Sequence, residues 1–409
     1  MMSYIVFQDA TLLDCTGKDP RYPVGVVVEG NRIREIVAGK AAVPAGAEVV
    51  DCRGKTLMPG LIESHIHLNL FEGEAAEQTR RNLPSMIVIK CLRIMEDTLM
   101  QGFTSALDAG GADAGFKNAQ AQGLVKGPRM QVCGHGLTQS GGHGDMRLPT
   151  EVNPPFAHPM AIGVVADGVD AVRRAAREEL RMGADYIKIM AAGGCASPAD
   201  EPDTVQYSLD EMRAAVEEAD AVGKICLAHC YSSRSMQRCA EAGVKRVEHG
   251  NFMDEETARI LKEKGVIYCP TLTTYDVMSR RGAEFGIPDY FLRKMKIANE
   301  CAQQALGYAV KAGLVIASGS DVVGPGQPFK GRELELKSRV MGPMGAILSS
   351  TKVNAEVMKV ADSVGTVEVG KLADLLLVDG NPLEDIALFQ DRDRIQIIMQ
   401  DGKFVKKTV

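Results

Sequence analysis

Two histidines, His65 and His67, are the residues whose type and spacing first suggest chemistry. Side chains two apart in a β-strand point to the same face, so both imidazoles would enter one space if residues 61–67 form a strand. Neutral imidazole is the commonest protein ligand for zinc and related metals. The pair therefore indicates a metal site, with a chance pair on a surface strand as the alternative.

Alternating strand-like and helix-like segments predict the frame that would position such a site. Helical stretches such as residues 169–182 and 209–222 separate the strand-like runs, and the second opens with a capping box at Ser208 and Glu211. Eight strands, each followed by a helix over about 300 residues, predict a (β/α)8 barrel. A doubly wound open sheet is disfavoured because no GxGxxG follows a first strand. The expected strands are 61–67, 103–108, 130–134, 186–190, 225–229, 246–249, 266–270 and 314–320.

Both ends of the chain are predicted to be β. Short apolar runs separated by Gly and Asn are typical of a small sheet. The runs are 4–7, 26–29, 32–37 and 48–51 near the start, and 365–370, 373–378, 395–399 and 403–405 near the end. We expect the ends to join into one β-sandwich domain, residues 1–58 plus 363–409, and residues 59–362 to form the barrel.

Composition limits the partners of this protein. Its 409 residues are 45% hydrophobic, which allows a large core. The net charge of −6 and the lack of a long basic run argue against nucleic acid. No signal-peptide pattern and no apolar run of membrane-spanning length is found, and the 10 cysteines without a CxxC motif read as reduced thiols. We therefore expect a cytoplasmic protein, away from membranes, that acts on a small molecule.

A barrel predicts that functional residues gather at the C-terminal ends of its strands. The predicted strand ends carry His65, His67, His229, His249 and Asp321. The chain has only 7 histidines, and chance explains poorly that four of them lie at such positions.

Lys188 lies inside the fourth predicted strand. A lysine near a strand end ordinarily reaches toward solvent. Here Tyr186, Lys188 and Met190 share one face, so we expect Lys188 to point into the barrel. A buried lysine loses its charge readily, and a neutral amine can capture carbon dioxide as a carbamate with two oxygens for two cations.

The order His-x-His, Lys, His, His, Asp on successive strands resembles the amidohydrolase superfamily. The resemblance extends along the chain through the entry segment 58–67 and the stretch 370–378. It implies hydrolysis of an amide, an ester or a similar bond by water that metal ions activate. It also implies a homo-oligomer. The ligands that it implies are His65, His67 and Asp321 for one divalent ion, His229 and His249 for a second, and N-carboxylated Lys188 with a hydroxide as bridges.

The resemblance gives Asp321 a catalytic role as well, because it would take the proton of the attacking hydroxide and pass it to the leaving group. We expect two zinc ions, although nitrogen and oxygen ligands suit manganese or cobalt alike.

Lys188 also favours one branch of the superfamily. The single-metal deaminases typically carry a glutamate where this chain has Ser232, and they lack the lysine. The imidazolonepropionase type is related in overall sequence but also uses one metal. Segments 140–145, 186–188 and 229–231 are similar to the prolidase and carboxypeptidase branch, which releases a C-terminal amino acid from dipeptides or N-acyl amino acids. We expect an Xaa-Pro dipeptidase; release of a basic or hydrophobic residue and a non-catalytic assembly protein are the alternatives.

Two further residues are candidates for catalysis and substrate binding. His143, in a glycine-rich segment, could donate to the scissile carbonyl or to a substrate carboxylate, and the hydroxyl of Tyr231 could donate to a carboxylate. A loop-stabilising histidine and a packed tyrosine are the alternatives. His135 and His158 are read as structural. Residues 324–328 and Arg332, just after Asp321, could border the substrate, but we favour a solvated surface loop.

Overall fold

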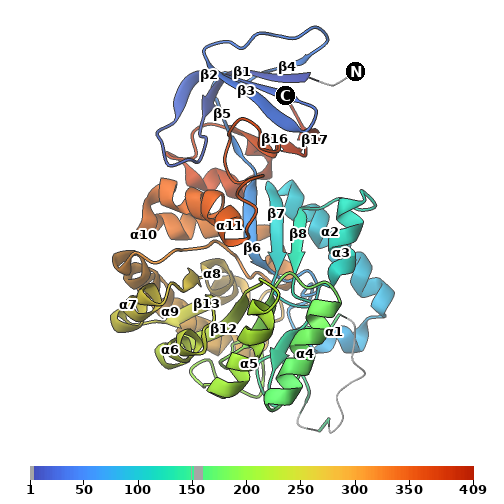
Figure 1. Ribbon diagram of the computed structural model, residues 1–409, viewed down its shortest axis with the longest axis vertical. Helices are drawn as coiled ribbons and strands as arrows, with labels where there is room; N and C mark the ends of the chain where they lie inside the picture. The colour runs from blue at the N-terminus through green and yellow to red at the C-terminus, as the bar shows by residue number, and fades with distance from the viewer. Residues whose placement is uncertain (1–3, 149, 152–159) are drawn as a thin grey trace. The chain divides into compact units, whose positions relative to one another are not determined.

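The computed structural model describes residues 4–148, 150–151 and 160–409. The described chain divides into two compact units (Figure 1). One comprises the residues up to 64 together with 97–105 and 330–409, and the other comprises 65–96 and 106–329. The domain bounds expected from the sequence, at residues 58 and 362, stay a prediction.

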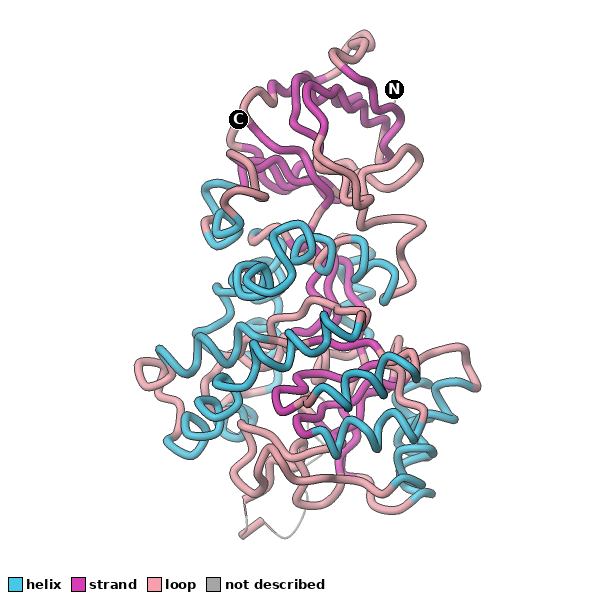
Figure 2. Tube along the Cα trace, turned by 90° about the vertical axis from the view of Figure 1, so that its left-hand side faces the viewer, coloured by secondary structure: helices cyan, strands magenta, loops and turns pink. Residues whose placement is uncertain are grey.

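The first unit contains the sheet that both chain ends build (Figure 2). Its strand order is β17-β16-β15-β5-β1-β2-β3, with β4 paired to β1. Antiparallel pairing of β5 with β15 sets Leu57 opposite Leu377 and joins the two ends, as predicted. The strands are β1 (Tyr4–Leu12), β2 (Arg21–Glu29), β3 (Arg32–Ala38), β4 (Glu48–Asp51), β5 (Lys55–Pro59), β15 (Leu375–Asp379), β16 (Ile395–Gln400) and β17 (Lys403–Lys407).

The strand expected at residues 365–370 is wrong, because turns and loop occupy that stretch. Gly365 and Gly370 have φ values of 92° and 93°, which break an extended run. A Cβ at Gly365 would lie 2.4 Å from the Cβ of Ala355, so this turn packs directly against its neighbour. Apolar side chains from β1, β2, β5, β15 and β16 form the core of the sheet.

The strands of the (β/α)8 barrel form two sheets. One sheet has the order β6-β7-β8, and the other runs β10-β9-β11-β12-β13-β14. The segment 314–320 pairs with β14 only through a bridge between Ile316 and Tyr268, so the eighth strand is shorter than predicted. The strands are β6 (Leu61–Ile66), β7 (Phe103–Asp108), β8 (Arg129–Val132), β9 (Gly136–Thr138), β10 (Gly163–Val165), β11 (Ile187–Met190), β12 (Cys226–Ser232), β13 (Arg246–Phe252) and β14 (Ile267–Cys269).

Helices follow the strands, and several begin where the sequence places a cap. Ser208 and Glu211 form the predicted capping box at the start of α5, and α4 lies beside α5 (Figure 1). In the described part of the chain no helix is both long and apolar enough to cross a membrane. The helices are α1 (Ala75–Arg81), α2 (Pro84–Met100), α3 (Ala114–Ala121), α4 (Val169–Arg181), α5 (Leu209–Asp220), α6 (Ser233–Ala242), α7 (Glu255–Glu263), α8 (Leu272–Arg281), α9 (Asp289–Ala312), α10 (Arg332–Ser349) and α11 (Lys352–Val357).

Candidate active site

His65, His67 and Asp321 form one group of potential metal ligands. The Nε2 atoms of His65 and His67 lie 3.5 Å and 3.4 Å from Oδ1 of Asp321. The backbone holds the group together, because the N–H of Asp321 donates to the carbonyl of His65 at 2.9 Å. A Cβ at Gly319 would lie 2.4 Å from the Cβ of His65, so only glycine allows this approach. Imidazole and carboxylate within 4.8 Å of one another are a suitable donor set for a divalent cation.

His229, His249 and Lys188 line the same pocket. His229 comes from β12 and His249 from β13, and their ring centroids are 4.5 Å apart. Lys188 on β11 is 1% exposed and lines the pocket together with Met190, as the shared strand face predicts. The structure therefore brings all six predicted ligand positions into one pocket, although β12 and β13 continue three residues beyond their histidines.

Each of the four imidazoles uses one ring nitrogen for a contact within the protein. A metal-ligating histidine commonly donates its other N–H in this way, which sets the tautomer and the ring orientation. In His65 and His67 the second nitrogen, Nε2, faces Asp321. The contacts are His65 Nδ1 to Glu248 at 2.6 Å, His67 Nδ1 to the carbonyl of Gly110 at 2.9 Å, His229 Nε2 to the carbonyl of Gly193 at 3.1 Å, and His249 Nδ1 to Thr271 Oγ1 at 2.8 Å.

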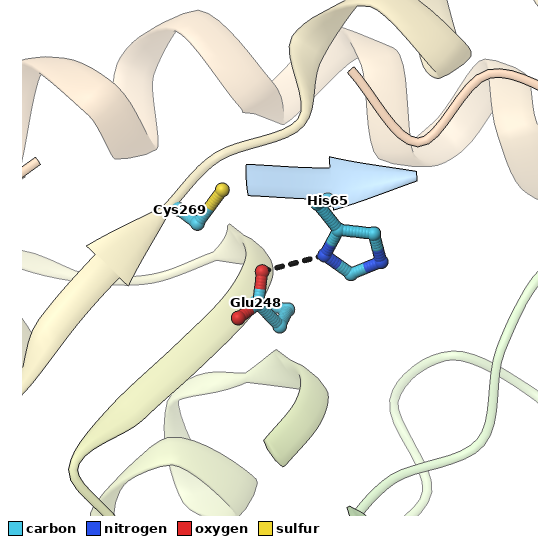
Figure 3. Close-up of side chains that lie close together, drawn as sticks. All are labelled: His65, Glu248 and Cys269. Atoms are coloured by element: carbon cyan, nitrogen blue, oxygen red, sulfur yellow. Dashed lines mark hydrogen bonds and ion pairs between the residues drawn. The ribbon is translucent and has the colours of Figure 1, made fainter. Parts of the chain in front are cut away.

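Glu248 lies behind His65, near Cys269 (Figure 3). These three residues could also surround a metal ion. The guanidinium of Arg246, however, lies 2.6 Å from the Glu248 carboxylate, and both side chains are fully buried. A cation at that point would face the positive charge of Arg246, so we interpret Glu248 as support for His65.

The electrostatics of the pocket favour neutral imidazoles and an ionised aspartate. Burial holds the pKa of His65, His229 and His249 well below the usual range, and Lys188 acts in the same direction. Burial alone would raise the pKa of Asp321, but the neighbouring imidazoles lower it below its ordinary value. His67 differs: burial lowers its pKa, yet its bond to Asp321 raises it overall.

Backbone strain is found at two of these potential ligands and at one of their partners. Three residues other than glycine, His249, Thr271 and Asp321, have φ values of 70°, 48° and 50°. This left-handed region costs of the order of 1–3 kcal/mol per residue, and such residues cluster at functional sites. The strain falls on two predicted ligands and on the hydroxyl partner of one of them.

His143 and Tyr231 both line the pocket. The ring of His143 stacks on that of His229 with centroids 4.2 Å apart, and its Nδ1 lies 2.8 Å from Ser197 Oγ. Burial lowers the pKa of His143. Tyr231 accepts a hydrogen bond from the hydroxyl of Tyr275 at 2.9 Å, and burial raises its pKa well above the usual value.

Sequence reasoning missed most of the pocket wall and the residues behind the imidazoles. Glu248 and Arg246 left one signal, since two opposite charges two apart in an apolar strand share a face. The apolar wall residues left none, because they come from loops and from α9. They include Leu70, Met146, Ile162, Phe291, Met295 and Val323.

The features read as structural have mixed outcomes. His135 bonds to the buried Glu179 at 2.8 Å, which agrees with a structural role. His158 lies outside the described residues. The solvated loop expected at residues 324–328 is wrong in part, because Gly324, Gly326 and Gln327 are buried. The amide of Gln327 donates to the carbonyl of Val322 at 2.9 Å and to two others, and this bonding draws the segment inward.

The barrel and the residues at its strand ends define a hydrolytic barrel enzyme. The chain belongs to the amidohydrolase family, whose family model, described as "Amidohydrolase family", matches residues 56–405. Ochratoxinase of Aspergillus niger is 32% identical over 375 residues, which cover 87% of this chain and 76% of that protein.

Two similar solved structures come from peptidases. A prolidase complexed with N-methylphosphonate-L-proline has a TM-score of 0.95 at 38% identity and covers 99% of this chain and 100% of its own. An Xaa-Pro dipeptidase with bound methionine in its active site has a TM-score of 0.90 at 27% identity, with coverages of 98% and 100%.

Proposed function

We propose that this protein is a binuclear-metal Xaa-Pro dipeptidase. The observation that carries the proposal is the meeting of His65, His67 and Asp321 with Lys188, His229 and His249 in one buried pocket. These donors fit two divalent cations, with His65, His67 and Asp321 holding one and His229 and His249 the other. Lys188, as a carbamate, would serve both. When bound, the ions supply water acidic enough to attack at neutral pH and polarise the scissile carbonyl.

The chain's own side chains would handle the proton and the substrate. Asp321, ionised by its imidazole neighbours, is able to take a proton from the attacking water and deliver it to the leaving nitrogen. His143 and Tyr231 lie next to the ligand imidazoles and would orient the substrate. Burial of His143 and Tyr231 limits access of bulk water to the reacting atoms.

The pocket wall supports an uncharged substrate side chain. Apart from Asp321, the described lining residues carry no carboxylate, and most of the rest are apolar. A basic side chain would therefore be buried without a partner, which costs free energy. Similarity to a prolidase and an Xaa-Pro dipeptidase favours proline as the released residue.

The test is a dipeptide screen on zinc-loaded protein in which the released amino acid is identified. We expect proline release from Xaa-Pro dipeptides, with little release of arginine or lysine from Xaa-Arg and Xaa-Lys. Efficient release of a basic residue would contradict the proposal. A screen without any product would favour the alternative of a non-catalytic assembly protein.

A second candidate is hydrolysis of an N-acyl amino acid whose released residue is not proline. The similarity to ochratoxinase and the apolar wall favour it. N-acyl-phenylalanine and N-acyl-leucine in the same screen distinguish the two candidates.

A further inference from the structure

A chain of hydrogen bonds leads from His143 away from the pocket. Nδ1 of His143 lies 2.8 Å from Ser197 Oγ, and the Ser197 hydroxyl donates in turn to Oδ1 of Asp200. Asp200 also accepts from the backbone N–H of Gly194 at 3.1 Å and from the amide of Gln206 at 2.7 Å. An ionised carboxylate only accepts, so all three groups must be donors.

The direction of each bond follows from that carboxylate. The single proton of the Ser197 hydroxyl is committed to Asp200, so its oxygen accepts from the ring and Nδ1 of His143 carries a proton. Gln206 closes the network because its Oε1 accepts from the backbone N–H of His143 at 2.9 Å. The ring of His143 is thus linked to Asp200 through Ser197, and its backbone N–H is linked to Asp200 through Gln206.

A buried cation fixes the loop that carries these groups. Lys294 of α9 is 2% exposed, and its ammonium donates to the carbonyls of Gly194 at 3.3 Å, of Ser197 at 2.8 Å and of Asp200. Of these residues, Gly194 and Ser197 contact the ring of His143, and Asp200 is linked to it through Ser197. A Cβ at Gly194 would lie 2.1 Å from Cε1 of the imidazole, so the loop packs directly on the ring.

We propose that Ser197 and Asp200 are positioning residues for His143, which hold its neutral ring as the Nδ1–H tautomer and leave Nε2 to meet the substrate. In this tautomer Nε2 is an acceptor and Nδ1 carries the proton. Asp200 places a negative charge behind that proton, in the way an aspartate supports a catalytic imidazole. The value of this arrangement for turnover rests on the proposed function.

The test uses the full chain with ¹⁵N-labelled histidine, with and without zinc, and long-range ¹H–¹⁵N spectra that report the tautomer. The signal absent from His143→Gln identifies His143. In the wild type we expect a protonated Nδ1. In Ser197→Ala, Nδ1 loses its acceptor and the ring should shift toward Nε2–H. With the zinc content unchanged, kcat/KM for an Xaa-Pro dipeptide should fall about tenfold, the worth of one hydrogen bond.

Two further variants keep the result decisive. Both carboxylate oxygens of Asp200 accept hydrogen bonds, so in Asp200→Asn the amide NH2 would face another donor in either orientation. This variant should therefore also disturb the tautomer of His143. Asp203→Asn, an exposed aspartate on the same loop, is the matched control and should change neither readout. An Nε2–H ring in the wild type, or an unchanged tautomer and kcat/KM in Ser197→Ala, would overturn the proposal. Absence of hydrolysis by the wild type would refute only the proposed function, because the spectra still decide the tautomer.

Discussion

At the scale of single residues, some side chains of the site face the cavity and others hold those side chains in position. Lys188 faces the cavity from β11 with a 1% exposed side chain. Glu248 stands behind His65 and is itself held by Arg246. Substitution of a residue that faces the cavity should lower the number of bound ions, whereas substitution of a supporting residue should weaken the metal affinity. Measurements of metal binding therefore distinguish the two kinds of residue.

Replacing Lys188 with Ala should remove the shared ligand for two ions. We expect hydrolysis to be lost, and the bound zinc to fall from about two ions per chain toward one, on the premise that a bridging carbamate needs both. Elemental analysis and activity check this, and circular dichroism controls for folding. Full activity of Lys188→Ala would refute the bridging role.

Glu248→Gln keeps the shape of the side chain but removes the charge that receives the His65 proton. Loss of such an outer partner typically weakens metal affinity by about 10–100-fold. Competition with a chromogenic chelator measures the affinity, with the exposed Glu256→Gln as matched control. Equal zinc affinity in the two variants would show that Glu248 does not support His65.

At the scale of elements, the loop after β11 depends on a helix about 100 residues further along the chain. Lys294 in α9 gathers three carbonyls of that loop, and the same loop presents Ser197 to His143. A displacement of α9 would therefore change the position of His143, because the backbone of this loop connects the two.

Lys294→Met should loosen this loop while preserving the length and apolar stem of the side chain. Three carbonyls, two of them on the buried residues Gly194 and Ser197, lose their donor, so hydrogen exchange at residues 193–206 should become faster. The exposed Lys296→Met on the same helix is the control. If the loop is equally protected in both variants, the ammonium does not hold it.

Sequence patterns predict the elements whose cause is local. The alternation that put Lys188 and Met190 on one face, and the capping box at Ser208, both reappear in the structure. The segment 314–320 was overestimated as a strand because Gly319 must instead approach His65. The contacts of Ser197 and Lys294 were out of reach, since their partners lie 54 and 97 residues away along the chain.

At the scale of the whole molecule, the six proposed ligands come from widely separated segments, yet all belong to one compact unit. The pocket thus depends on the folded state of that unit, and folding buries several histidines at once. The homo-oligomer expected from the family resemblance stays a prediction that sedimentation can test.

The metal-free protein should lose stability as the pH falls below about 6.5, the ordinary histidine value. His65, His229 and His249 have folded-state pKa values below it, so the unfolded chain binds more protons there and the free energy of unfolding decreases. The raised pKa of His67 opposes this as one group against three. We expect the thermal midpoint to drop between pH 7 and pH 5.5, with a shallower slope in His249→Asn. A midpoint that rises on acidification would contradict the assignment.

The protonation of the imidazoles also affects how many protons are released when the metal binds. Near neutral pH, three of the four rings and Asp321 have no proton to give up at the atoms that face the pocket. Carbamate formation from carbon dioxide releases two protons when the amine starts as an ammonium and one when it starts neutral. With bicarbonate as the source each count is one lower, because a water molecule is also formed. Calorimetric titration with zinc in buffers of different ionisation enthalpy, with and without bicarbonate, would therefore register the chemical state of Lys188 almost free of background from the histidines.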